Sequence, residues 1–127
     1  MRISVVNEQR GEGFSDTVSE ASVCKYRSSG DKFYITYETE ESKVMIKLED
    51  GAMYLKRAGE YGSGIAYIPG ERTAVDYRTP YGIIAMDVYT DLVEYELSES
   101  GGVIELSYTL SIGGDGLENR MKIKIER

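Results

Sequence analysis

The sequence predicts an all-β protein: a single antiparallel up-and-down β-barrel of about ten strands that spans residues 1–127. Apolar and polar residues alternate along most of the chain, which is the pattern of half-buried strands. The alternating segments are separated by Gly, Asp, Asn and Ser, and none shows a 3.6-residue period. The composition, with 11 Tyr and 2 Pro, adds to the β character. Such strands can form a sandwich or a closed barrel, and we favour the barrel because closure removes exposed edges.

Four segments show the alternation most clearly and are expected to be strands: Lys32–Glu38, Lys43–Glu49, Val103–Ile112 and Asn119–Glu126. In the second segment, Val44, Ile46 and Leu48 share one face. The basic side chains of the last segment form a stripe on its outer face. We expect this stripe to pair with polar and acidic side chains of the neighbouring strand.

A type I′ hairpin is predicted at Asp50-Gly51, the strongest two-residue hairpin signal in the chain. Pairing Glu49 with Ala52 sets Val44 opposite Arg57. Every apolar residue of the two strands then falls on one face, so the register is internally consistent. The same register directs Arg57 into the barrel.

A four-residue type I turn is predicted at Thr79–Gly82. Tyr77 and Ile84 must share a face, so the loop between them holds an even number of residues. A two-residue loop at Pro80-Tyr81 would require a positive φ at Pro80, which the proline ring forbids. The stretch is therefore expected to be a corner with four unpaired residues.

A change of phase near Thr90-Asp91 predicts a β-bulge. Apolar residues such as Val88 are even-numbered before this point, whereas those after it, such as Val93, are odd-numbered. A bulge accounts for the shift and lets a sheet curl. No linker or repeat divides the chain, so one domain is expected.

Composition restricts the function classes. The net charge of −7 disfavours nucleic acid or an anionic membrane as the main partner. The chain has no His and a single Cys, so an enzyme, a zinc site and an internal disulfide are not expected, and neither is a cofactor. The opening MRISVVNEQRGEG has no apolar core of a secretory signal, so we expect a cytoplasmic protein.

Several stretches occur in an order and spacing that resemble a known family: SSGDKFYITYE, MYLKRAG, YRTPYGIIAMDVYTD, GVIELSYTL and NRMKIKI. The resemblance is to the YwiB-like bacterial proteins of unknown function, and its most specific pieces are Arg57 with Gly59 and the Thr-Pro-Tyr-Gly corner. It implies a small cytoplasmic barrel of the calycin, lipocalin-like class. It brings no activity and no catalytic residue, and the lipocalin analogy offers ligand binding only as a hypothesis.

Arg57 is the main candidate for ligand binding, because an inward guanidinium without a partner is costly. Either carbonyls, a Tyr hydroxyl or Glu71 satisfy it, or it lies at the base of a cavity and binds a carboxylate or phosphate. The alternation places further candidates inside the barrel: Tyr37, Tyr67, Tyr77, Tyr95, Tyr108 and Asn119. The tyrosine rings either line a pocket or fill a narrow barrel.

Two loops carry weaker candidates. Arg57–Gly64 is rich in Gly but lacks the GxxxxGK[ST] spacing of a phosphate loop, so we interpret it as a mobile loop at the barrel mouth. Ser111–Asn119 has too few carboxylates for a calcium loop and is interpreted as a turn. No metal site is predicted.

Two functions remain open. The first is a small-molecule carrier or sensor that binds an apolar or anionic ligand in the barrel interior. The alternative is a non-catalytic interaction or scaffold module with a filled barrel. Its outer Ile83 and Tyr89 would dock a protein or pair the subunits of a homodimer. The volume of the barrel interior distinguishes the two.

Overall fold

The computed structural model describes residues 1–40, 42–59 and 62–127, and these residues form ten antiparallel strands and no helix that could cross a membrane. The strands are β1 (Arg2–Gly11), β2 (Phe14–Ser29), β3 (Lys32–Glu38), β4 (Lys43–Glu49), β5 (Ala52–Ala58), β6 (Ser63–Tyr67), β7 (Arg72–Thr79), β8 (Gly82–Ser98), β9 (Gly101–Ile112) and β10 (Asp115–Glu126). Their order in the sheet is β6-β5-β4-β3-β2-β1-β10-β9-β8-β7. The predicted all-β barrel is confirmed.

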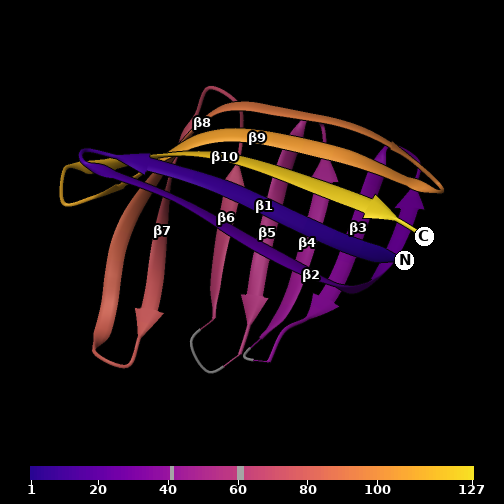
Figure 1. The fold of residues 1–127 in the computed structure, drawn as a ribbon, viewed down its shortest axis with the longest axis horizontal. Helices are drawn as coiled ribbons and strands as arrows, with labels where there is room; N and C mark the ends of the chain where they lie inside the picture. The colour runs from indigo at the N-terminus through magenta and orange to yellow at the C-terminus, as the bar shows by residue number, and fades with distance from the viewer. Residues whose placement is uncertain (41, 60–61) are drawn as a thin grey trace.

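The first and last strands of the chain pair with each other at the centre of the sheet. β1 pairs with β10 along nearly its whole length, from Arg2 opposite Glu126 to Arg10 opposite Glu118. The two termini therefore lie side by side (Figure 1). All the remaining pairs of adjacent strands in the sheet are also consecutive in the sequence, which makes the fold an up-and-down meander.

Two long bent strands turn the meander into a barrel. β2 pairs with β1 through Phe14–Val23 and with β3 through Cys24–Ser29. β8 likewise pairs first with β7 and then with β9. In Figure 1 the strands β3–β6 run steeply behind the long strands β1, β9 and β10, so the two layers cross.

The barrel is nearly closed, and its seam lies between β6 and β7, the two ends of the sheet order. The Gly70 N–H donates to the Thr90 carbonyl at 2.8 Å, and the Thr90 N–H donates to the Glu71 carbonyl at 3.2 Å. The Thr73 hydroxyl donates to the Ala66 carbonyl at 2.9 Å. The first two bonds join the β6–β7 connection to β8, and the third joins the start of β7 to β6. Among the described residues the seam is open beyond them.

Local turn chemistry sets the registers as the sequence predicts. Asp50 and Gly51 have φ angles of 51° and 76°, as a type I′ turn requires. The predicted pair of Val44 with Arg57 is present. The predicted bulge is also confirmed, because the pairing of β8 with β9 shifts between Thr90 and Leu92.

The Thr79–Gly82 corner is tighter than expected. Tyr77 lies opposite Ile84 as predicted, but the ladder continues to Thr79 opposite Gly82. Only Pro80 and Tyr81 remain in the loop, so the expectation of four unpaired residues is wrong. The positive φ falls on Gly82, at 124°, and not on Pro80, which removes the steric objection to a short loop.

The core fills one end of the barrel, where β3–β6 cover β1, β9 and β10. Its fully buried apolar side chains include Ile35, Leu48, Met53, Ile104 and Ile123. Each contributes roughly 1.5–3 kcal/mol of burial free energy. At the other end, residues that the alternation directs inward remain exposed: Val18 is 53%, Tyr77 44% and Ile84 41% accessible. The barrel interior is therefore packed at one end and open at the other.

Candidate functional site

A cavity of about 830 Å³ lies at the open end of the barrel. Its walls come from β2, the β3–β4 turn, the end of β5, the start of β6 and the β7–β8 corner. The polar side chains around it include Glu20, Glu40, Ser42, Arg57, Ser63 and Arg78. The cavity occupies the part of the seam where β6 and β7 are no longer joined.

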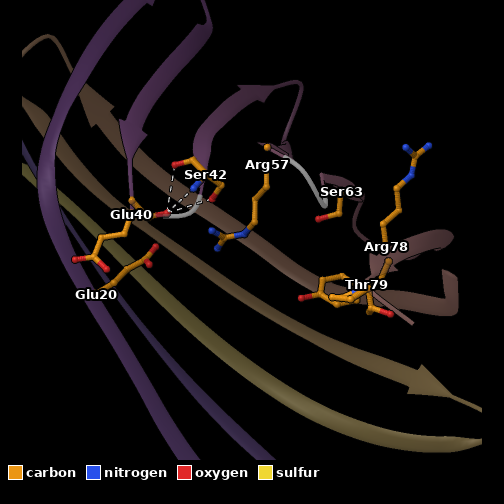
Figure 2. A pocket seen from close by; sticks show the side chains of 11 residues that line it. Glu20, Glu40, Ser42, Arg57, Ser63, Arg78 and Thr79 are labelled. Carbon is orange, nitrogen blue, oxygen red and sulfur yellow. Dashed lines mark hydrogen bonds between the residues drawn. The ribbon is translucent and has the colours of Figure 1, made fainter. Parts of the chain in front are cut away.

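Arg57 lies near the end of β5, opposite Val44 on β4 and Ser63 on β6. This position makes the side chain inward-facing and half-buried. Figure 2 shows that its guanidinium extends into the cavity, on the side of Glu20 and Glu40. No carboxylate among the described residues forms a salt bridge with it. Glu71 is exposed at the seam, where its carbonyl oxygen is the bonded group.

Glu20 forms the acidic wall of the cavity together with Glu40 (Figure 2). The Tyr37 hydroxyl donates a hydrogen bond of 2.5 Å to Glu20 Oε1, which fixes this carboxylate. Burial and then this bond raise the pKa of the Tyr37 hydroxyl above its usual value, while the positive charge of Arg57 acts in the opposite direction. Tyr37 is thus a buried donor that holds Glu20 at the cavity.

Hydroxyl groups lie on both sides of Arg57. Ser42 belongs to a tight turn in which the Thr39 N–H donates to the Ser42 carbonyl at 2.8 Å. The Ser42 N–H donates in return to Thr39 Oγ1 at 3.1 Å, which fixes the turn at the cavity rim. Ser63, the first residue of β6, lies on the other side of Arg57 (Figure 2).

Two buried tyrosines lie deeper in the barrel. The rings of Tyr67 and Tyr108 are tilted against each other with centroids 4.7 Å apart. Burial raises the pKa of both hydroxyls, and the charge of Arg57 opposes the rise in both. The Arg57 guanidinium is therefore close enough for its positive charge to act on the pKa of both hydroxyls.

Asn119 is buried beside this group, opposite Tyr108 on β9. The Asn7 side-chain amide donates to Asn119 Oδ1 at 3.1 Å, and the Asn119 amide donates to the Leu117 carbonyl at 2.9 Å. These bonds satisfy Asn119 internally, so its role here is to connect β1 with β10.

The structure brings some of the predicted site residues together and separates one. Arg57 and Tyr77 line the cavity, and Tyr37 reaches it through Glu20. Tyr95 lies at the opposite end, where its hydroxyl accepts the Gly51 N–H at 3.2 Å and its ring meets Phe33 edge-on. Tyr95 therefore has no part in this site.

Glu20, Glu40 and Ser42 line the cavity, although the sequence analysis did not select them. A signal for Glu20 was present, because a hairpin at Glu12-Gly13 pairs it with Val5 and so directs it inward. No comparable signal existed for the β3–β4 turn, whose place depends on the bend of the whole barrel.

The remaining sequence candidates are accounted for in other ways. Arg57–Gly64 includes Glu60 and Tyr61, which lie outside the described residues. Ser111–Asn119 is a hairpin whose Gly113 and Gly114 have positive φ angles of 59° and 94°. In the basic stripe, Lys122 Nζ lies 3.8 Å from a Glu105 carboxylate on the next strand, the expected cross-strand arrangement.

Comparisons with known proteins agree with the barrel. A crystal structure of the ywiB protein from Bacillus subtilis matches with a TM-score of 0.89 over 98% of this chain and 89% of that chain. The two sequences are 20% identical, so this likeness shows a shared fold. No curated protein has significant similarity to the chain. Residues 3–125 match the domain of unknown function DUF1934, and the chain belongs to this family.

Proposed function

We propose that the barrel binds a small anionic molecule in the cavity at its open end, with Arg57 as the anchor. One observation carries the proposal: the Arg57 guanidinium extends into a cavity of about 830 Å³, and no carboxylate of the described residues pairs with it. The planar fork of a guanidinium fits a carboxylate or a phosphate. The volume lies within the usual range of small-molecule sites.

The mouth of the barrel is a better place for this ligand than its centre. Tyr67 and Tyr108 fill the interior beyond Arg57, and both are almost fully buried. The Ser42 and Ser63 hydroxyls add donors or acceptors beside the guanidinium. The half-exposed ring of Tyr77 offers an apolar wall for the body of the ligand.

Glu20 and Glu40 narrow the class of ligand. Their carboxylates line the same cavity and would repel a second anionic group. They accept hydrogen bonds, so they favour a ligand with a hydroxyl or an ammonium group away from its anionic end. We therefore propose a compact molecule with a single anionic group and a hydrogen-bond donor at the other end.

The proposed role is that of a non-catalytic carrier or sensor in the cytoplasm. The single Cys24 is buried, which fits a protein kept in a reducing compartment. The net charge of −7 leaves Arg57 as a local positive site in an acidic protein, so recognition depends on the cavity and not on long-range attraction.

Thermal unfolding with a panel of anions tests the proposal. The probes are acetate, inorganic phosphate, glycerol 3-phosphate and L-serine, each compared with sodium chloride at equal ionic strength. We expect at least one probe to raise the Tm of the wild type and to lose this effect in Arg57→Gln, because ligand binding stabilises the folded state. Arg120→Gln is the matched control: it removes the same charge from an exposed position on β10 that does not line the cavity. Equal Tm shifts in both variants would contradict an anchor at Arg57.

Native mass spectrometry of gently purified protein is the complementary test. An adduct present in the wild type and absent in Arg57→Gln would identify the natural ligand by its mass. Bare protein in both, together with no Tm shift from any probe, would overturn the proposal.

A second candidate is an interaction module, and the β7–β8 corner favours it. Tyr81 is 99% and Ile83 65% exposed there, which is unusual for large apolar side chains. Tyr89, the other predicted contact residue, lies beneath the Arg72 guanidinium at 6.0 Å from the ring centroid. If this corner docks a protein, Ile83→Glu should lose a partner that the wild type retains in pull-down experiments.

A further inference from the structure

The first half of β2 has a free edge. Phe14–Val23 pairs with β1 on one side, whereas β3 joins the other side only at Cys24–Ser29. Within the described ranges, no strand pairs with that other side of Phe14–Val23. In Figure 1, β2 accordingly lies at the lower edge of the long strands that cross the front of the barrel.

The hydrogen bonds to β1 show which backbone groups are free. The Cys24 N–H donates to the Met1 carbonyl at 2.9 Å, so even-numbered residues of β2 direct their N–H and C=O groups to β1. The odd-numbered residues direct theirs to the free side: Ser15, Thr17, Ser19, Ala21 and Val23. Each of them offers one donor and one acceptor to a neighbouring strand.

The outward-facing side chains of this edge do not protect it. The same odd-numbered residues face outward, all are exposed, and none is charged. The facing strand β1, by contrast, presents Arg2, Glu8 and Arg10 on that surface. Exposed edges are commonly protected by Lys, Pro, a bulge or inward-pointing charges. Phe14–Val23 contains no Lys or Pro, its register with β1 is continuous, and its charged residues Asp16 and Glu20 lie on the inner face.

The free groups are symmetric about Ser19. If two copies run antiparallel with Ser19 opposite Ser19, Thr17 faces Ala21 and Ser15 faces Val23. Every free group of both edges then has a partner, which gives about ten intermolecular hydrogen bonds. No other register uses the whole edge.

The charges agree with this register. On the inner face, Glu20 then lies opposite Val18 and Asp16 opposite Ser22, so no like charges face each other directly. A slip of two residues, which moves the two-fold centre to Val18, would place Asp16 opposite Glu20, which is unfavourable. The Ser19 register therefore has both the most hydrogen bonds and the least repulsion.

There is space for a second strand where β2 meets β3. β3 turns away after Tyr37 and leaves a hollow of about 500 Å³ beside Ala21 and Ser22. Val23, at this end of the edge, is 66% exposed. The hollow lies between this end of the edge and the Tyr37–Glu40 segment, so the Ser15 end of an added strand would lie beside that segment.

We propose that two copies of this chain pair through Ser15–Val23 of β2, antiparallel and centred on Ser19. The interface is isologous, since one segment contacts itself across a two-fold axis. It joins the long-strand layers of both barrels into one continuous sheet. The pairing uses the backbone of odd-numbered residues, and these do not line the Arg57 cavity; Glu20, on the inner face of the same segment, does.

Sedimentation velocity of the full chain tests the dimer. We expect the wild type to be dimeric in the micromolar range and Ser19→Pro to be monomeric. The Ser19 N–H faces the partner and not β1, so proline removes no hydrogen bond within the subunit. Circular dichroism checks that the variant retains its β structure. A monomeric wild type, or a dimer that persists in folded Ser19→Pro, would overturn the proposal.

Disulfide trapping tests the register and does not rely on the proline variant. In a Cys24→Ala background, the Cα atoms of two Ser19→Cys residues would lie about 5.5 Å apart, within disulfide range. Two Ala21→Cys residues in the same register would be separated by about 14 Å. Mild oxidation should therefore crosslink Ser19→Cys and leave Ala21→Cys largely monomeric on non-reducing gels. Equal crosslinking of both, or none in Ser19→Cys, would overturn the Ser19 register.

Discussion

A Gly-Gly pair begins β9 (Gly101-Gly102), another forms the β9–β10 connection (Gly113-Gly114), and the two lie at opposite ends of the barrel (Figure 1). A Cβ atom on Gly101 or Gly102 would collide with the carbonyl oxygen of Ile125 or Glu96. A Cβ atom on Gly113 or Gly114 would meet no described atom within 4 Å. The same dipeptide is thus required by packing at one end and only by backbone conformation at the other.

This difference extends to the whole barrel. At the closed end, the β3–β6 layer covers the long strands and buries Leu48, Met53 and Ile104. At the open end, Tyr77 and Ile84 face inward without a covering layer. A binding cavity needs unfilled volume, and this fold obtains it by leaving one end of the barrel uncovered. The four predictions below measure the contrast between the two ends.

The largest effect is expected at the glycines. Gly102→Ala should destabilise the protein by roughly 4 kcal/mol, because it combines a backbone clash with a positive φ. Gly113→Ala should cost only about 1 kcal/mol, because φ strain acts alone there. Urea unfolding of both variants gives the two values. Equal losses would mean that the ends are packed alike.

Replacing one isoleucine by alanine at each end of the barrel should show the same contrast in stability. Ile104 is fully buried at the closed end, so Ile104→Ala is expected to cost about 3 kcal/mol through lost burial and a new cavity. Ile84→Ala, at the 41% exposed position, should cost less than about 1 kcal/mol. Denaturant midpoints at constant m-value provide the comparison, and a large loss at Ile84 would show a hidden packing partner.

Alkaline pH should act on the buried tyrosines where the two ends meet. Tyr37, Tyr67 and Tyr108 have raised pKa values, so they retain their protons in the folded protein where the unfolded chain loses them. Their contribution is fully present below about pH 10 and is lost as the pH rises further. Each tyrosine lowers the free energy of unfolding by about 1.4 kcal/mol per pH unit in that range.

Tyr37→Phe isolates one of these contributions. Its free energy of unfolding should fall less steeply than that of the wild type, by about 1 kcal/mol from pH 10 to 11, because the tyrosine of the unfolded chain is half ionised at pH 10. The slope is the informative quantity, because loss of the bond to Glu20 lowers stability at every pH. Urea unfolding at several pH values measures it. An unchanged slope would show that Tyr37 ionises without unfolding.

The smallest change in stability is expected for a substitution on the outer surface of the barrel. Lys122 and Glu105 form an exposed cross-strand pair at 3.8 Å. Lys122→Ala should change stability by less than about 0.5 kcal/mol, because solvent and salt screen such pairs. A larger loss in urea unfolding would indicate that the basic stripe contributes more to the sheet than its geometry implies.

Local chemistry determined much of the fold. Asp50-Gly51 set the β4–β5 register, and with it the inward position of Arg57, because a type I′ turn admits one pairing. The change of phase at Thr90-Asp91 located the bulge in β8, because side chains alternate strictly along a strand. The corner at Thr79–Gly82 was predicted in register and missed in length, because the freedom of Gly82 to adopt a positive φ was not considered.

The candidate site was predictable only in part. Arg57, Tyr37 and Tyr77 were selected correctly as inward-facing, since parity within a hairpin is a local property. Parity does not report which inward residues share one end of the barrel, so Tyr95 was grouped with them although it lies at the other end. Glu20 and Glu40 line the same cavity as Arg57 because of the bend of β2 and the position of the β3–β4 turn, which depend on contacts between distant strands.

The sequence by itself determined the strands, most of their registers and the family to which the chain belongs. These follow from alternation, turn residues and short motifs, and each acts over a few residues. The tertiary structure alone decided where the seam opens, which end is filled and which strand edge is left free. These features arise because β2 and β8 bend between two crossing layers, and such a bend reflects the packing of the whole sheet.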